Sequence, residues 1–220
     1  MSAAPERGAT LRVGGRRLPD GEPFSVVARG ERWEHDDGGR AELEVAGWVL
    51  PGLVDVHTHP GAHEVGDAFD EAVLRADLVA EVDAGVTALR APGLAGDPPA
   101  WFGVDPELPR AFHAGPWLAR PGQFFEGWGR RVADEEFAAV AAAQAATTGW
   151  CKIVGDWSLG DEPLPAEVLA DVVAAVHAVG GRVAVHTQHA AGGDAAVRAG
   201  VDSIEHGMCL DAANLDAMRA

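Results

Sequence analysis

The sequence predicts an α/β fold made of parallel βα units of the barrel type, with a small β layer in front of them. From Pro51 onward, short apolar runs alternate with helix-like runs, as they do in parallel βα units. The connections from helix to strand are short and marked by glycine, whereas those from strand to helix are long and rich in Pro, Gly and Trp. In a (β/α)₈ TIM-like barrel, long loops of this kind build the active site at the carboxyl ends of the strands. We therefore predict a partial barrel of about six βα units.

The first 50 residues have a different pattern. Short apolar runs are separated by turn-forming pairs at Gly14-Gly15, Asp20-Gly21 and Gly38-Gly39. Such spacing predicts a small antiparallel β layer. Because so few strands are not stable alone, this layer is expected to pack on, or be completed by, another part of the structure. The predicted domains are therefore a β layer at residues 1–50 and barrel units at residues 51–220.

Six strands and two helices can be located within the barrel region. The strands are expected at residues 53–56, 86–89, 111–114, 150–154, 182–185 and 201–204. One helix should begin at Asp134, a good N-cap residue, and end at Gly149. Another should begin near Pro165 and end at Val179, before two glycines.

The charge of the chain excludes two classes of partner. There are 34 acidic and 17 basic residues, which gives a formal charge of −17. Such a surface repels nucleic acid and anionic lipid, so we expect neither as a partner. No apolar stretch has the length of a signal peptide or a membrane span, and the two cysteines, Cys151 and Cys209, do not make a disulfide framework. The expected location is the cytoplasm.

Four histidines stand at the ends of predicted strands. His57 and His59 are two residues apart after the first strand, so their side chains point to the same side. His186 closes the fifth predicted strand and His206 closes the sixth. Imidazoles that converge from strand ends are natural metal ligands. Asp55 lies on the same side of its strand as His57 and could orient one of the imidazoles from behind.

Lys152 is the only lysine in the chain, and it lies inside an apolar strand. Burial lowers the pKa of an amine, which can then be neutral and reactive. A neutral amine can take up carbon dioxide and form a carbamate, whose two oxygens can bridge two metal ions. The alternative is a lysine that is ion-paired or extends to solvent near the strand end. Its uniqueness in the chain favours a functional role.

Five stretches of the chain carry a resemblance to a known family. They are PGLVDVHTHP, AGVTALRAPG, WCKIVGDW, RVAVHTQHAAGGDAAVRAG and GVDSIEHGM. In this order they resemble the metal-dependent amidohydrolase superfamily, in particular its imidazolonepropionase-like and prolidase-like branch. The resemblance implies a distorted (β/α)₈ barrel joined to a small β-sandwich, whose N-terminal part would be residues 1–50.

The resemblance also implies a metal centre and a reaction. His57 and His59 would bind the more buried metal, Lys152 would carry a bridging carbamate, and His186 and His206 would bind the second metal. One or two divalent ions are expected, and zinc suits these ligands best. The implied reaction is hydrolysis of an amide or related C–N bond in a peptide-like or cyclic small-molecule substrate by metal-activated hydroxide.

The family also has a catalytic aspartate at the end of the eighth strand, and no residue here is assigned to that role. The sequence stops after the sixth predicted unit, so we expect a truncated chain. Two alternatives stay open. One is a catalytically inactive metal-binding fragment, and the other is a mononuclear deaminase-like relative in which Lys152 is not carboxylated. Whether the chain forms a homo-oligomer is also open.

Further residues are candidates for substrate binding. His189 follows His186 in the loop above the predicted site. Arg90 ends the second predicted strand and could receive a carboxylate, or could pair with a structural acid. The tryptophans of the long loops could form an apolar wall for the substrate: Trp101, Trp117, Trp128 and Trp157.

Overall fold

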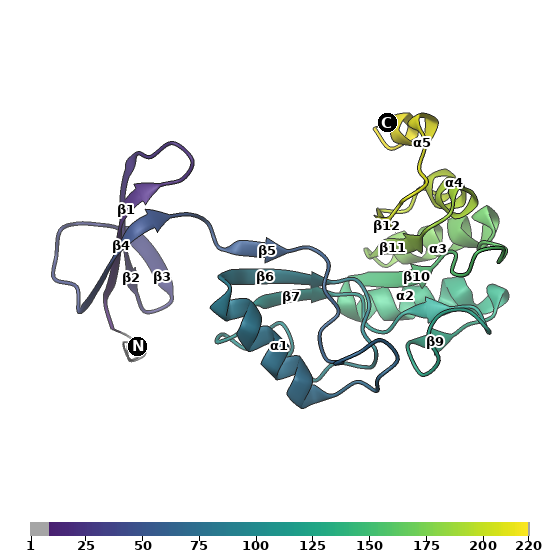
Figure 1. Cartoon of the computed structure of the whole chain (residues 1–220), viewed down its shortest axis with the longest axis horizontal. Coiled ribbons are helices and arrows are strands. Elements are labelled where there is room, and N and C mark those ends of the chain that lie inside the picture. The colour runs from purple at the N-terminus through teal and green to yellow at the C-terminus, as the bar shows by residue number, and fades with distance from the viewer. Residues whose placement is uncertain (1–8, 220) are drawn as a thin grey trace. The chain divides into compact units, whose positions relative to one another are not determined.

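The structure is a computed structural model that describes residues 9–219 of the chain (Figure 1). The chain divides into two compact units, Met1–Gly52 and Leu53–Ala220. None of the helices in residues 9–219 combines the length and the apolar character needed to cross a membrane.

The first unit is a four-stranded sheet with strand order β3-β2-β1-β4. Its strands are β1 (Leu11–Arg17), β2 (Pro23–Arg29), β3 (Arg32–His35) and β4 (Leu43–Val49). Both β1–β2 and β2–β3 are antiparallel, but β1 pairs with β4 in parallel. The prediction of a purely antiparallel layer is therefore wrong. The connection at residues 36–42 returns the chain to the far side of β1 instead of adding a further hairpin strand.

One predicted turn in this unit is also wrong. Gly14 and Gly15 lie inside β1 and not between two strands. Gly15 has a φ of +140°, and a Cβ atom there would lie 1.8 Å from the carbonyl oxygen of Gly47 in β4. Glycine is thus needed for close approach of two strands. The turn at Asp20-Gly21 is confirmed, because Gly21 has a φ of +72° and its N–H donates to the carbonyl of Arg17.

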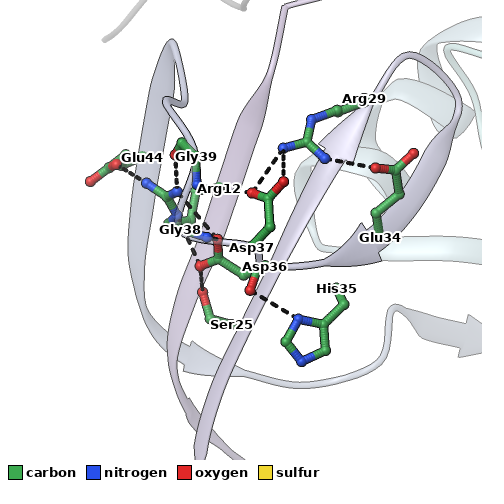
Figure 2. A network of polar contacts seen from close by, with 10 residues as sticks. All are labelled: Arg12, Ser25, Arg29, Glu34, His35, Asp36, Asp37, Gly38, Gly39 and Glu44. Carbon is green, nitrogen blue, oxygen red and sulfur yellow. Dashed lines mark hydrogen bonds and ion pairs between the residues drawn. The ribbon is translucent and has the colours of Figure 1, made fainter.

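Charged side chains fix the connection after β3 to the sheet (Figure 2). The Arg12 guanidinium pairs with Asp36 at 3.0 Å, and Arg29 pairs with Asp37 at 3.1 Å. Hydrogen bonds from the Ser25 hydroxyl and from Arg12 hold the pKa of Asp36 well below its usual range. These contacts are at the surface and so contribute little free energy each, but together they determine the path of the connection that carries β4 alongside β1.

The second unit contains two parallel sheets. Strands β5 (Leu53–Asp55), β6 (Val86–Ala91) and β7 (Arg110–His113) form the first sheet. The second has the order β12-β11-β10-β8-β9. Its strands are β8 (Leu118–Ala119), β9 (Arg130–Arg131), β10 (Trp150–Val154), β11 (Arg182–Thr187) and β12 (Ser203–His206). The predicted mixed α/β class with parallel strands is confirmed, whereas closure into a barrel stays a prediction.

The six predicted strands correspond to β5, β6, β7, β10, β11 and β12. The last begins two residues later than predicted, at Ser203. The reason is Asp202, whose carboxylate accepts a hydrogen bond from the backbone N–H of Val183 at 2.8 Å and so forms the bend before the strand. Strands β8 and β9 have only two residues each, which is too short for a periodic pattern to predict them.

Helices separate most of these strands. They are α1 (Glu71–Asp83), α2 (Phe137–Thr148), α3 (Ala166–Ala178), α4 (Ala190–Ala199) and α5 (Ala212–Ala217), with a 3₁₀ turn at Asp134–Glu136. The end of α2 at Gly149 is confirmed, with a φ of +78° there. The predicted N-cap is wrong, because Asp134 begins the 3₁₀ turn and its carboxylate accepts from Arg120 at 2.7 Å instead of capping the helix.

The main core lies where α2, α3 and α4 cover β10 and β11, and it contains Cys151.

We expect one fast-reacting thiol in the folded protein and two after unfolding. Cys151 is fully buried and burial raises the pKa of its thiol to about 12, so thiolate is scarce at pH 8. Cys209 is exposed. Titration with a chromogenic disulfide reagent, with and without denaturant, counts both classes. Two fast thiols in the folded protein would contradict this packing of β10.

Candidate metal centre

Four of the five predicted metal ligands line one cavity of about 390 Å³. These are His59, Lys152, His186 and His206. The fifth, His57, has its ring centroid 4.9 Å from that of His59 and 5.1 Å from that of His206. The rings of His186 and His206 are 4.7 Å apart. Residues from the loop after β5 and from β10, β11 and β12 therefore come together, as the sequence predicted.

The rings of His57 and His59 are held in matching orientations. The Nδ1 atom of His57 lies 2.7 Å from Oε2 of Glu205, and Nδ1 of His59 lies 2.8 Å from the carbonyl oxygen of Gly93. If each Nδ1 carries the proton and donates it to the oxygen, each Nε2 keeps a free lone pair. The two Nε2 atoms face one another at 3.0 Å. Two imidazoles held from behind with their Nε2 atoms converging have the arrangement of a pair of metal ligands.

Two nitrogen atoms of the cavity are buried without a hydrogen-bond partner. They are Nζ of Lys152 and Nε2 of His186. The Lys152 side chain is only 1% exposed, and burial lowers its pKa to about 7. Burial also lowers the pKa of His186 to about 3. A buried polar atom without a partner is costly and calls for an explanation, and coordination of a metal, directly or through a carbamate, would supply one.

The donor set fits a divalent metal best if the lysine takes part. Within residues 9–219, no three His, Cys, Asp or Glu side chains have a geometry that could hold a metal ion. The histidine rings instead lie next to one another in the order His59, His57, His206, His186. A ligand derived from Lys152, which lines the same cavity, would add a donor to the pair at either end of this row.

The sequence analysis missed Glu205, the residue that holds the His57 ring. Glu205 is 5% exposed and also accepts from the hydroxyl of Ser203 at 2.7 Å. Burial alone would raise its pKa, but the hydrogen bond with His57 and other contacts keep the pKa well below its usual range. Asp55, which was predicted to orient a histidine ring, accepts from the backbone N–H of His57 at 2.9 Å. The sequence did contain a signal for Glu205, because it is an acidic residue inside an apolar strand and next to His206.

Arg90 lies beside Glu205 and does not line the cavity. Its Nη1 donates to Oε1 of Glu205 at 2.8 Å, and its guanidinium lies 4.6 Å from the ring centroid of Trp150. Of the two roles considered for Arg90, the contact with a structural acid is therefore present. A role in substrate binding stays a prediction.

Comparisons with known proteins extend over most of the chain. No protein-family model matches it. Uncharacterized proteins of Mycobacterium tuberculosis and Mycobacterium bovis are 35% identical to it over an alignment of 215 positions, which covers 93% of this chain and 57% of theirs. The chain thus spans little more than half the length of the curated relatives it matches.

Solved structures resemble the chain in fold. A prolidase complexed with N-methylphosphonate-L-proline matches with a TM-score of 0.76 and 22% identity, and a Xaa-Pro dipeptidase with bound methionine matches with 0.73 and 21%. Both matches cover 96% of this chain and 64% of the other. A structure described as an amidohydrolase has a TM-score of 0.69 and 19% identity over 93% of this chain and 62% of its own. The chain shares the amidohydrolase fold. The resemblance drawn from the sequence motifs is confirmed at this level.

One side of the cavity in this amidohydrolase fold is formed by five aromatic residues, here called the aromatic wall. They are Trp117, Phe124, Phe125, Trp128 and Trp157. Three of the four tryptophans considered from the sequence thus lie together. Trp101 lies elsewhere, against the core of the β5-β6-β7 sheet, and its Nε1 donates to Glu71 at 2.6 Å.

A buried carboxylate fixes the loop after β11. Asp156 is fully buried and accepts from the backbone N–H groups of Gln188 at 2.7 Å and His189 at 3.1 Å. It lies at the N-terminus of α4, where a negative charge is favourable. His189 is the N-cap residue of α4 and does not line the cavity, so its predicted substrate contact stays a prediction.

Two cavity residues have an unusual backbone conformation. Phe124 and His206 have φ values of 67° and 66°, and they are the non-glycine residues with positive φ in the described part of the chain. Both line the cavity. Left-handed conformations are costly for bulky residues and gather at functional sites. The cavity is therefore the place in the amidohydrolase fold of this chain where function is most strongly indicated.

Proposed function

We propose that this chain is part of a metal-dependent hydrolase that cleaves an amide or related C–N bond. The observation that carries the proposal is the meeting of His59, Lys152, His186 and His206 at one cavity, with His57 next to His59 and His206 and with a buried amine that has no partner. The fold shared with a Xaa-Pro dipeptidase and a prolidase supports it. The proposal includes the partial (β/α)₈ barrel and the β-sandwich portion at residues 1–50.

The residues would divide into two metal-binding pairs. His57 and His59 would hold one divalent ion, His186 and His206 a second, and a carbamate on Lys152 would supply the shared oxygen ligands. Zinc suits this mixture of imidazole nitrogen and carboxylate-like oxygen. When bound, such ions act as Lewis acids that polarise a carbonyl and lower the pKa of water. A single ion without carboxylation of Lys152 is the second candidate, since each histidine pair could serve alone with a further ligand.

The chain's own groups prepare the site for this chemistry. Glu205 orients the ring of His57, and the carbonyl of Gly93 orients that of His59. Asp156 fixes the backbone of the loop that contains Gln188, a residue of the cavity lining. The aromatic wall excludes water from one side, which strengthens electrostatic interactions inside the cavity.

Metal analysis joined to an activity screen tests the proposal. We expect the full-length protein to contain one to two equivalents of divalent metal and to hydrolyse some members of a panel of N-acyl amides. The His57→Ala variant should lose both properties. Bound metal without hydrolysis of any amide would instead favour the inactive metal-binding alternative. If the protein contains no bound metal, even after incubation with zinc, the proposal is wrong.

Three further predictions from the sequence are also proposals. These are a cytoplasmic location, a small-molecule or peptide-like substrate, and the absence of nucleic acid and membrane partners. The acidic balance of the chain, with a formal charge of −17, supports the last of these.

A further inference from the structure

The aromatic wall has a packed inner layer and an accessible outer layer. Trp117 and Trp128 are only 3% and 6% exposed, and their rings stack with an interplanar angle of 8°. Phe124, Phe125 and Trp157 are half-buried and line the cavity. The inner pair supports the wall, whereas the outer three rings offer apolar surface that a ligand can cover.

The wall stands directly beside the proposed metal ligands. The ring centroid of Trp117 is 4.8 Å from that of His59, and the centroid of Trp157 is 5.4 Å from that of His186. If one group of a ligand lies on the outer rings, the bond that joins this group to the rest of the ligand would therefore lie at the histidines. This proximity distinguishes the wall from the other aromatic residues of the chain, such as Trp33 on the exposed face of β3.

The backbone around the wall is shaped to admit these rings. Gly93 has a φ of +125°, and a Cβ atom there would lie 2.4 Å from the indole of Trp117. Phe124, a bulky residue, adopts the left-handed conformation in which its ring lines the cavity. Side-chain packing does not require Phe124 to adopt this strained backbone conformation at the cavity surface. The conformation therefore indicates that the aromatic wall binds a ligand.

We propose that the outer rings of the aromatic wall bind an aromatic group next to the scissile bond. The substrate class is then an aromatic amide, such as an anilide. This inference rests on the proposed function, because it takes the histidines and Lys152 as the reacting end of the cavity. Stacking on the outer rings supplies the affinity for the aromatic group.

Ligand-observed NMR on the full-length protein as purified tests the inference with two probes. Acetanilide has the aromatic ring, and N-methylacetamide has the same amide without a ring. Acetanilide is expected to bind at least about tenfold more tightly than N-methylacetamide. The Trp157→Ala variant should weaken acetanilide binding by at least about tenfold, and Trp33→Ala, which alters an exposed tryptophan of the other unit, should not.

Each other result overturns the inference. Equal binding of acetanilide and N-methylacetamide would exclude a role for the ring. Unchanged binding in Trp157→Ala would exclude the wall. If circular dichroism finds that variant unfolded, Trp157→Leu, which keeps apolar volume without the aromatic face, takes its place with the same expected loss.

The same spectra separate this inference from the proposed function, since acetate release reports turnover. Selective binding of acetanilide without turnover of any amide would leave the inference in place and count against the hydrolase. Turnover of small aliphatic amides without preference for a ring would support the hydrolase and overturn the inference.

Discussion

Replacing Lys152 with methionine is expected to abolish hydrolysis while the protein stays folded. The amine is buried without a hydrogen-bond partner, and methionine has a similar length and no polar group to satisfy. Removing an unsatisfied buried donor should raise the free energy of unfolding of the metal-free protein by about 1–3 kcal/mol. Losing a metal ligand should remove several kcal/mol of transition-state stabilisation, so that hydrolysis falls by at least about 10³-fold.

The matched control is Lys152→Arg, which keeps a cation but cannot form a carbamate. Arginine stays charged when buried, so this variant should lose hydrolysis and also stability. Denaturant unfolding, metal content and hydrolysis rates are measured for both variants. A carbamate signal from ¹³C-labelled bicarbonate is expected in the parent protein and in neither variant. Full hydrolysis by Lys152→Arg would exclude the carbamate, and a less stable Lys152→Met would give the amine a structural role instead.

The features of the fold that depend on local patterns were predictable from the sequence. Apolar runs bounded by glycine located the strands β5, β6, β7, β10, β11 and β12. The end of α2 followed from Gly149, whose positive φ suits the residue after a helix. The meeting of His59, Lys152, His186 and His206 was also predictable, because parallel strands bring their carboxyl ends to one side.

Contacts between distant parts of the chain were not predictable in this way. Glu205 and Arg90 are separated by 115 residues, and no local pattern pairs them. The parallel pairing of β1 with β4 depends on the path of residues 36–42 and on two glycines that allow close approach. Asp134 would suit a helix N-cap, but a neighbouring arginine, Arg120, takes its carboxylate. In each case a tertiary contact overrides a local preference.

The Glu205→Gln variant is expected to bind metal about 10–100-fold more weakly, although Glu205 is not itself among the proposed ligands. Glutamine keeps the shape of the side chain and can accept a hydrogen bond from Nδ1 of His57. It lacks the negative charge that makes the imidazole a better donor to a metal and fixes its orientation. Zinc affinity measured by competition with a chelating dye tests this expectation. An unchanged affinity would mean that the 2.7 Å contact between Glu205 and His57 has no influence on the metal.

The same substitution leaves the guanidinium of Arg90 without its carboxylate, so part of its effect could come from a weakened fold. Arg90 is 21% exposed in its side chain and Glu205 is 6% exposed, and the broken pair should cost about 2–3 kcal/mol, somewhat less than a fully buried one. The double variant Arg90→Met with Glu205→Gln removes the unpaired charge and should recover most of this stability. Its zinc affinity should stay as low as that of the single variant, because the ring of His57 still lacks its carboxylate. Recovery of metal affinity together with stability would mean that Glu205 supports the fold and does not act through His57.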